Sequence, residues 1–532
     1  MRRALPLALA LCLGAAGCGR KHPYPAPERY LPADAPLAVV VPALGAAVRQ
    51  AGALYRTVAE APPAAQLAEG YAAVKAQLGF DPLDPRGLEQ AGVDPSGSAA
   101  FAAGVARTPL LVLPILDIAR FDSTAARLAR DRMGATERVA YQAKGVEIVV
   151  FRRSSASGAA LAYAARGPHV LLAPGARGPD VLAEAATLPE ERSLGKSPLW
   201  ARGRAAVGDG YLVTALAPPG SPSLAAFRLA RDGVALGVRA SATSLGTRLA
   251  LLLSPEREAF WKSLVAEPSA SASSPEVSRL SPEAALLFRW GGDPVGGFRR
   301  AEPLLPPDLV RSLAAAHLDP ERDLLAALAP GAVLSLAVAP TFTVTEFSSP
   351  HFDVRRADPF RLLELEAVLH LREPAAVPAL LGRLAKAGRR LGVQVTPKGS
   401  SAWTIGWGKA RLGVGVSGGR LFVAGPADRL PALAGRAGGA GYRAPTEAAG
   451  AALAAGMGGA VVDVDHLVRS IEALPEEAYG SGPSAVVMRS LVARYLEPAS
   501  ALATVSLRLD LAPGAALLDL EVVGREGPPA RP

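Results

Sequence analysis

Five segments from the first half of the chain recur, in the same order, in the second half. The first pair is "RYLPADAPLAVVV" and "SRLSPEAALLFRW", each a proline turn with an acid before a short apolar strand. The paired segments are 29–41 with 278–290, 83–104 with 318–339, 109–134 with 362–388, 145–185 with 401–435, and 227–242 with 505–524. A spacing of roughly 230 to 280 residues is too long for a solenoid. The sequence therefore predicts two tandem copies of one large domain.

The boundary between the copies is predicted at 266–282, "AEPSASASSPEVSRLSP". Its Ser/Pro/Ala composition and lack of periodicity are typical of a linker. The first copy is then expected over 31–265 and the second over 283–526, with a disordered tail at 527–532. A chain of 532 residues, half of them apolar, is long enough for more than one core.

Local patterns indicate the fold class of each copy. Segments 121–134 and 376–392 carry helical spacing and end at glycine. Segment 411–425 is typical of a hairpin turning at 417–419, and 227–242 alternates across an Asp-Gly turn. Hairpins interrupted by single helices predict an α+β fold, in which helices cover a largely antiparallel sheet.

The N-terminus is typical of an export signal. Arg2 and Arg3 precede an apolar stretch, 4–14, that is too short to span a hydrocarbon core of about 30 Å. Residues 1–17 are therefore expected to be a signal peptide. Residues 18–30, "CGRKHPYPAPERY", are expected to form a Pro-rich tether behind it.

The residues Ala15-Ala16-Gly17-Cys18 resemble a bacterial lipobox. This resemblance implies cleavage before Cys18, a diacylglyceryl group on its sulfur and an acyl chain such as palmitate on the new amine. Gly19, where Asp would be the alternative, implies sorting to the periplasmic face of the outer membrane. The alternative interpretation is an ordinary signal peptide in which Cys18 has no role.

Cysteine content and charge exclude several function classes. Cys12 and Cys18 are the only cysteines, so the body of the protein contains no disulfide and no cysteine metal site. Cysteine avoidance suits an oxidising compartment. The net charge of +9 is dispersed, with basic clusters of only two or three residues, whereas nucleic-acid binders concentrate basic side chains on one face. Nucleic acid is therefore not an expected partner.

The strongest metal candidate is "VVDVDHLVRSIEAL" at 461–474. Asp463 and Asp465 share one face if this segment is a strand, and His466 is adjacent. The alternative interpretation is a strand followed by a helix that Asp465 caps and that begins at His466. His351 with Asp353 is a weaker pair.

No catalytic residue and no cofactor are predicted. The isolated histidines His169, His317 and His370 lack partners at triad or zinc-site spacing.

Other motifs have simpler structural explanations. The aspartates of 81–97 do not fit an EF-hand loop; instead, Asp84 is expected to cap a helix that starts at Pro85 and ends at Gly92. Asp319-Pro320 repeats this device in the second copy. The "GVSGG" of 415–419 matches a nucleophile elbow in letters, but a strand follows it.

Two further motifs also have structural explanations. The "GKS" of 195–197 lacks the first glycine of a phosphate loop, and Pro198 is expected to block a following helix. Trp403, Ile405 and Trp407 share one strand face, which indicates sheet core, with an aromatic ligand platform as the alternative.

The duplicated pattern resembles an uncharacterised family of bacterial envelope proteins, a domain of unknown function that opens with a phrase like Leu31-Pro32-Ala33-Asp34. The hairpin-then-helix unit "GRLFVAGPADRLPAL" is also similar. The first functional hypothesis is a non-enzymatic lipoprotein that binds or scaffolds another envelope or cell-wall component. The alternatives are a metal-dependent or other hydrolase using Asp463, Asp465 and His466, and a periplasmic inhibitor or chaperone of a secreted protein.

Overall fold

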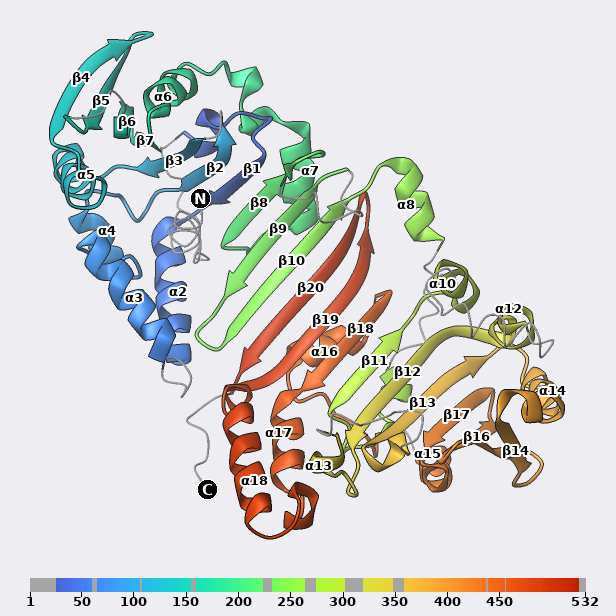
Figure 1. Ribbon diagram of the computed structural model, residues 1–532. Helices are drawn as coiled ribbons and strands as arrows, with labels where there is room; N and C mark the ends of the chain where they lie inside the picture. Colours follow the sequence, from blue (N-terminus) through green and yellow to red (C-terminus); the bar gives the residue numbers. More distant parts are fainter. Residues whose placement is uncertain are drawn as a thin grey trace. The chain divides into compact units, whose positions relative to one another are not determined.

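The structure is a computed structural model (Figure 1). The described residues are 25–59, 65–105, 108–154, 159–222, 232–263, 274–301, 319–347, 358–436, 439–454 and 456–525. Contacts divide the chain into two compact units, Met1–Glu258 with Ala512–Asp519, and Ala259–Leu511 with Leu520–Pro532. Both units combine helices with antiparallel strands, which confirms the predicted α+β class.

Among its described residues, the first unit has ten strands of its own in one antiparallel sheet. Their spatial order is β4-β5-β6-β7-β3-β2-β1-β8-β9-β10. The strands are β1 Leu37–Val41, β2 Ala99–Val105, β3 Thr108–Pro114, β4 Glu137–Ala143, β5 Val146–Arg152, β6 Ala159–Arg166, β7 His169–Pro174, β8 Val213–Ala217, β9 Val234–Ala240 and β10 Ser244–Leu252.

Helices pack on both faces of this sheet. One core cluster joins it to α6 and α7, and the other joins it to α2, α4 and α5. The helices of the unit are η1 Pro27–Tyr30, α2 Leu44–Ala59, α3 Ala65–Leu78, α4 Pro85–Gln90, α5 Ile118–Met133, α6 Gly178–Ala186, η3 Glu190–Arg192, η4 Leu194–Lys196 and α7 Pro198–Val207; α8 Pro255–Lys262 spans the boundary.

The first unit also takes up a short segment from near the C-terminus. Ala515 and Leu517 belong to its core cluster, and Asp519 accepts hydrogen bonds of 2.7 and 2.8 Å from Arg248. These residues lie in the first half of β20, Ala515–Gly524.

The second unit contains a sheet ordered β14-β15-β16-β17-β13-β12-β11-β18-β19. All of these neighbours pair antiparallel. The strands are β11 Leu286–Trp290, β12 Leu328–Val338, β13 Leu363–Leu371, β14 Val393–Pro397, β15 Ala402–Trp407, β16 Ala410–Ser417, β17 Arg420–Gly425, β18 Gly458–Asp463 and β19 Leu502–Ala512.

Helices are distributed unevenly over this second sheet. On one face, α15 and α16 form a core with the central strands, while α14 packs on the opposite face over β15–β17. A separate cluster joins α13, η10 and α18. The helices are α9 Ser274–Val277, α10 Pro294–Ala301, α12 Pro320–Asp323, η7 Leu325–Ala327, α13 Val344–Phe347, η8 Pro359–Arg361, α14 Ala376–Leu391, η9 Ala427–Arg429, α15 Leu430–Gly435, α16 Glu447–Ala454, α17 Val464–Glu472, η10 Glu476–Tyr479, α18 Pro483–Leu496 and η11 Ala499–Ala501.

Several local predictions are confirmed. The helices α5 and α14 end at Gly134 and Gly392, whose positive φ values of 66° and 67° form left-handed caps. The β16–β17 hairpin turns at Gly418 and Gly419, both with positive φ, as a two-residue hairpin loop requires. The hairpin predicted within 227–242 is placed differently in the structure. Strand β9 pairs with β10 after a turn at 241–243, and residues 223–231 lie outside the described residues.

The predicted linker, 266–282, is described only from residue 274 onward. Residues 274–277 form the short helix α9, and Leu280 is fully buried in the core of the second unit. This part of the segment therefore packs as a component of that unit. No helix among the described residues is long and apolar enough to cross a bilayer.

His169 should make the first unit acid-sensitive. Its side chain is fully buried at the start of β7, and burial lowers its pKa below the ordinary value of 6.5. His169 therefore binds a proton more readily in the unfolded chain than in the folded chain. The free energy of unfolding consequently falls as the pH drops below about 6.5. We expect the free energy of unfolding to decline less steeply between about pH 7 and pH 5 in His169→Gln. Denaturant titrations at both pH values measure this slope, and equal slopes in the two proteins would contradict it.

Candidate functional site

The registers of the second sheet place a continuous set of apolar residues on one face of β19, β18, β11, β12 and β13. Directly paired residues of antiparallel strands point to the same side. The rows, each in the order β19 to β13, are Val505–Val462–Leu286–Leu336–Leu365, Leu507–Ala460–Phe288–Leu334–Ala367 and Leu509–Gly458–Trp290–Ala332–Leu369. We call these three rows the open face.

Solvent reaches the middle of the open face. Phe288 is 44% exposed, Leu286 38% and Leu507 36%. Farther along the same face, Trp403 and Ile405 are covered by α14. Helix α10 follows β11 at one end of the strands, and α13 and α17 lie near the other end (Figure 1).

The opposite face of the same strands is buried although it carries polar groups. An antiparallel sheet with one solvated face normally places apolar residues inside and polar residues outside. Here the buried positions include Arg289, Ser335, Glu366, Thr504 and Ser506. The buried face of these central strands therefore mixes polar side chains with the apolar core residues Leu287, Val333, Val368 and Val461.

Ion pairs and hydrogen bonds accommodate this buried polarity. Glu366 accepts hydrogen bonds of 2.9 and 3.3 Å from Arg436, and Arg289 donates one of 3.1 Å to the carbonyl of Gly456. Burial raises the pKa of Glu364, while the neighbouring Arg429 guanidinium opposes that rise. Paired in this way, buried charges cost far less than isolated ones.

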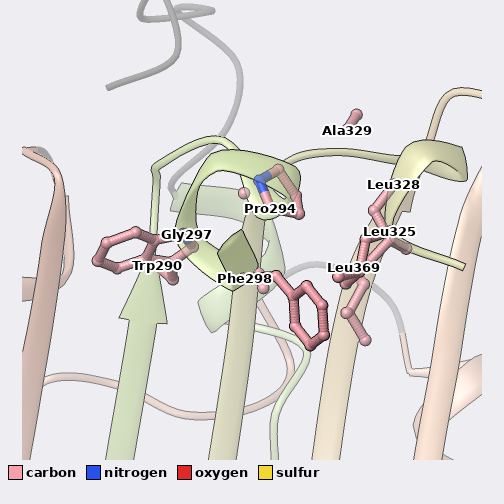
Figure 2. A pocket seen from close by; sticks show the side chains of 10 residues that line it. Trp290, Pro294, Gly297, Phe298, Leu325, Leu328, Ala329 and Leu369 are labelled. Atoms are coloured by element: carbon pink, nitrogen blue, oxygen red, sulfur yellow. The ribbon is translucent and has the colours of Figure 1, made fainter. Parts of the chain in front are cut away.

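The open face continues into an apolar pocket beside α10 (Figure 2). The pocket has a volume of about 360 Å³. Figure 2 shows the Phe298 side chain extending from α10, with Trp290 on one side and Leu325, Leu328 and Leu369 on the other. The complete lining is Trp290, Pro294, Gly297, Phe298, Leu325, Leu328, Ala329, Gly331, Ala332 and Leu369. No ionisable side chain is among these described lining residues.

Charged residues occur close to the pocket lining in the sequence. Arg372 follows β13 and lies 3.6 Å from Asp293, which accepts a hydrogen bond from the Gly296 amide near the start of α10. Arg299, the residue after Phe298, pairs with Glu321 of α12 through two hydrogen bonds. Apolar lining beside polar groups is the usual composition of a binding site for a small molecule with an apolar part.

A second exposed apolar set lies on α18. Val487, Leu491 and Tyr495 follow one another at helical i, i+4 spacing and are 68%, 45% and 76% exposed. The adjacent side of the helix packs through Ala485, Met488 and Val492. This stripe provides a comparison for experiments on the open face.

The three metal candidates make separate contacts. Asp463 caps α17 by accepting a hydrogen bond of 2.9 Å from the His466 amide. Asp465 pairs with Arg469 and Arg525, while His466 Nε2 lies 3.0 Å from the carbonyl oxygen of Glu283. Groups of three or more potential ligands are absent among the residues that the structure describes.

The interpretation of this segment as a strand and a helix needs one correction. The cap is Asp463 and α17 begins at Val464, so both lie two residues before the expected Asp465 and His466. Asp465 instead lies in the first turn, where a carboxylate interacts favourably with the helix dipole.

The Asp-rich segment of the first unit serves helix capping, as predicted. Asp84 accepts a hydrogen bond of 2.9 Å from the Arg86 amide, and α4 starts at Pro85. Asp94 accepts from both the amide and the hydroxyl of Ser96. In the second unit, Asp319 repeats the cap by accepting from the amides of the residues two and three positions ahead.

Ser417 is the last residue of β16, directly before the hairpin turn, and the strand β17 follows that turn as predicted, whereas a nucleophile elbow needs a helix there. The prediction that Pro198 blocks a helix is wrong. Ser197 caps α7, and Pro198 occupies its first position, where a missing amide hydrogen has no cost.

The aromatic strand face is divided between core and solvent. Trp403 is buried under α14 and Ile405 packs beside it, whereas Trp407 is 58% exposed. His370 lies 4.0 Å from the buried carboxylate of Glu276. His317, His351 and Asp353 lie outside the described residues, as do Cys12, Cys18 and the whole expected signal peptide.

Sequence interpretation missed the open face, although a signal for it was present. In "AALLFRW", Leu286, Leu287 and Phe288 are consecutive apolar residues, so both faces of β11 carry apolar side chains. A strand buried on both faces has this pattern. The sequence alone does not say which helix covers the second face.

Replacing Asp463 separates a capping role from a metal role. We expect Asp463→Ala to reduce the free energy of unfolding by about 1 kcal/mol, because the first turn of α17 loses its cap. Asp463→Asn should remain close to the original stability, because asparagine caps equally well. Thermal unfolding of both variants, with and without added divalent metal, measures this. Equal losses in both variants together with metal-dependent stability of the original protein would contradict the capping role.

The comparisons with known proteins identify no family. No family model matches the chain, and no curated protein matches it. Among solved structures, crystal form IV of TP0453 aligns with a TM-score of 0.25 and 11% identity, covering 45% of this chain and 86% of that one. Crystal form III aligns with a TM-score of 0.26 and 11% identity, covering 44% and 82%. TM-scores and identities this low carry no argument about function.

Proposed function

We propose that this protein is a non-enzymatic binding protein, anchored through lipidated Cys18 at the periplasmic face of the outer membrane. In this proposal the open face holds the apolar part of another envelope component. The observation that carries the proposal is the set of three apolar rows across β19, β18, β11, β12 and β13, part of which is exposed to water.

The physical argument rests on the cost of exposed apolar surface. Each Å² that a ligand covers contributes about 25 cal/mol to binding before the costs of association are subtracted. Single exposed apolar residues are common, but a contiguous patch marks an interaction site. Leu286 and Phe288 belong to such a patch, because their paired neighbours on both sides are apolar as well.

The duplication is part of the same proposal. The order β4-β5-β6-β7-β3-β2-β1-β8-β9 in the first unit corresponds strand by strand to β14-β15-β16-β17-β13-β12-β11-β18-β19 in the second. This correspondence supports two copies of one domain. In the first copy α2 and α4 cover the face that is open in the second. The duplication would then have left one copy structural and the other free to bind.

The alternative hydrolase hypothesis receives less support. Asp463, Asp465 and His466 are each engaged by a different partner, so they do not converge on one point. A binding role is also consistent with the apolar lining of the pocket beside α10. The inhibitor or chaperone hypothesis would require pairing at a sheet edge, and no observation favours it over binding at the open face.

Lipidation is tested directly at the predicted attachment point. In cells supplied with a clickable palmitate analogue, the original protein should be labelled and should fractionate with the outer membrane. Cys18→Ala should lose the label, because it lacks the thiol that carries the diacylglyceryl group. In-gel fluorescence measures the label, and labelling of Cys18→Ala would contradict the assignment.

Binding at the open face is tested with an apolar dye. We expect the chain to enhance 1-anilinonaphthalene-8-sulfonate fluorescence and Phe288→Thr to reduce that enhancement by about half or more, because a dye on the central row loses its aromatic contact. Threonine preserves the β-propensity of the strand.

Val487→Thr is the matched control, because it removes an exposed apolar side chain from α18 instead. It should leave most of the enhancement intact. Loss of dye binding in Val487→Thr, with none in Phe288→Thr, would move the binding surface to α18 and contradict the proposed function.

A further inference from the structure

We propose that the pocket beside α10 binds the hydrocarbon chain of a single fatty acid, with the rest of the ligand extending onto the open face. This inference rests on the proposed function and specifies the ligand class. The pocket and the open face are continuous, because Trp290, Ala332 and Leu369 belong both to the pocket lining and to the third apolar row.

The lining selects for hydrocarbon. Its side chains, from Trp290 and Phe298 to the leucines of η7, β12 and β13, offer no ionisable partner to a ligand. A hydroxyl or amide group that entered would lose its hydrogen bonds to water at a cost of roughly 1–3 kcal/mol. A methylene group instead gains about 0.8 kcal/mol on leaving water. The preferred occupant is therefore an unsubstituted chain.

The volume indicates one chain. A pocket of about 360 Å³ lies near the lower end of the roughly 300–1,000 Å³ that small-molecule sites span, so it suits part of one chain. Two parallel chains of a diacyl lipid would have to share this space. A long single chain fills the pocket and continues along the row that contains Trp290.

The charged residues near the pocket complement the acid end of such a ligand. Arg372 is 3.6 Å from Asp293, and the side chain of Arg372 is 52% exposed. An exposed guanidinium can exchange one carboxylate for another at little net cost, since exposed ion pairs contribute only about 0–1 kcal/mol. A fatty-acid carboxylate that lay at the end of β13 could therefore pair with the Arg372 guanidinium.

Gly297 allows the pocket to be filled without disturbing the backbone. A β-carbon added there would lie 3.6 Å from Trp290 Cζ2, which is an ordinary contact, and the residue has no positive φ. Gly297→Leu therefore adds a side chain beside Trp290. Gly382→Leu is the matched control, because Gly382 is an exposed residue of α14 with open space around an added β-carbon.

The test uses 9,10-dibromostearic acid, whose bromine atoms quench nearby tryptophans. The original chain and Gly382→Leu should show saturable quenching, and Trp290→Phe should lose the quenchable component of the emission. Gly297→Leu should bind at least about tenfold more weakly, because its leucine occupies the space of the chain. Vesicles that carry the same brominated chain on phosphatidylcholine form a second arm, in which a diacyl lipid should quench less.

The possible outcomes separate this inference from the proposed function. Unaltered quenching in both Gly297→Leu and Trp290→Phe would overturn the pocket assignment, and stronger quenching by the diacyl lipid would overturn the choice of a single chain. Absence of quenching, with dye binding that still depends on Phe288, would overturn the fatty acid but leave the proposed function standing. If Gly297→Leu fails to fold, the comparison with Trp290→Phe still decides where the bromines bind.

Discussion

The organisation of the second unit depends on the pairing of charges behind its central strands. Glu366 is buried on the face that α15 and α16 cover, where it accepts hydrogen bonds from the half-buried Arg436 and lies 3.9 Å from Arg429. Every strand residue must point to one face or the other, so the apolar residues that alternate with Glu366 point to the opposite side. One register therefore places both the buried charges and the core residues Leu287, Val333 and Val368 inward and the three apolar rows outward, and a slip by one residue would exchange the two faces.

The two units differ in how helices cover the second face of the sheet. In the first, α2, α4 and α5 cover the face that the other helices leave free, and two core clusters result. In the second, α14 covers the outer strands and leaves Leu286 and Phe288 accessible. In the proposed function, the face that helices cover in the first unit is the face that binds a ligand in the second. The apolar rows of that face extend into the pocket beside α10 through Trp290, Ala332 and Leu369.

Much of the local structure could be predicted because its causes are local. Asp84 and Pro85 specify a helix start, and Gly134 or Gly418 supplies a backbone conformation that few other residues adopt. The open face could not be predicted, because it depends on which helices pack over β11 and β12, and that is decided by contacts between distant segments. The "LLF" of β11 fits a strand buried on both faces equally well. The pocket likewise requires Trp290, Phe298 and Leu369 to lie close together in the fold. The spacing of these residues in the sequence does not indicate that contact.

The contribution of β20 to the first unit has a consequence for how the chain acquires its structure. Asp519 follows its partner Arg248 by 271 residues, and Ala515 and Leu517 are core residues of the unit that begins near the N-terminus. Domains commonly fold in the order in which they emerge. Here the core of the first unit is complete only after residues 515–519 have emerged, which is later than all the strands of the second sheet.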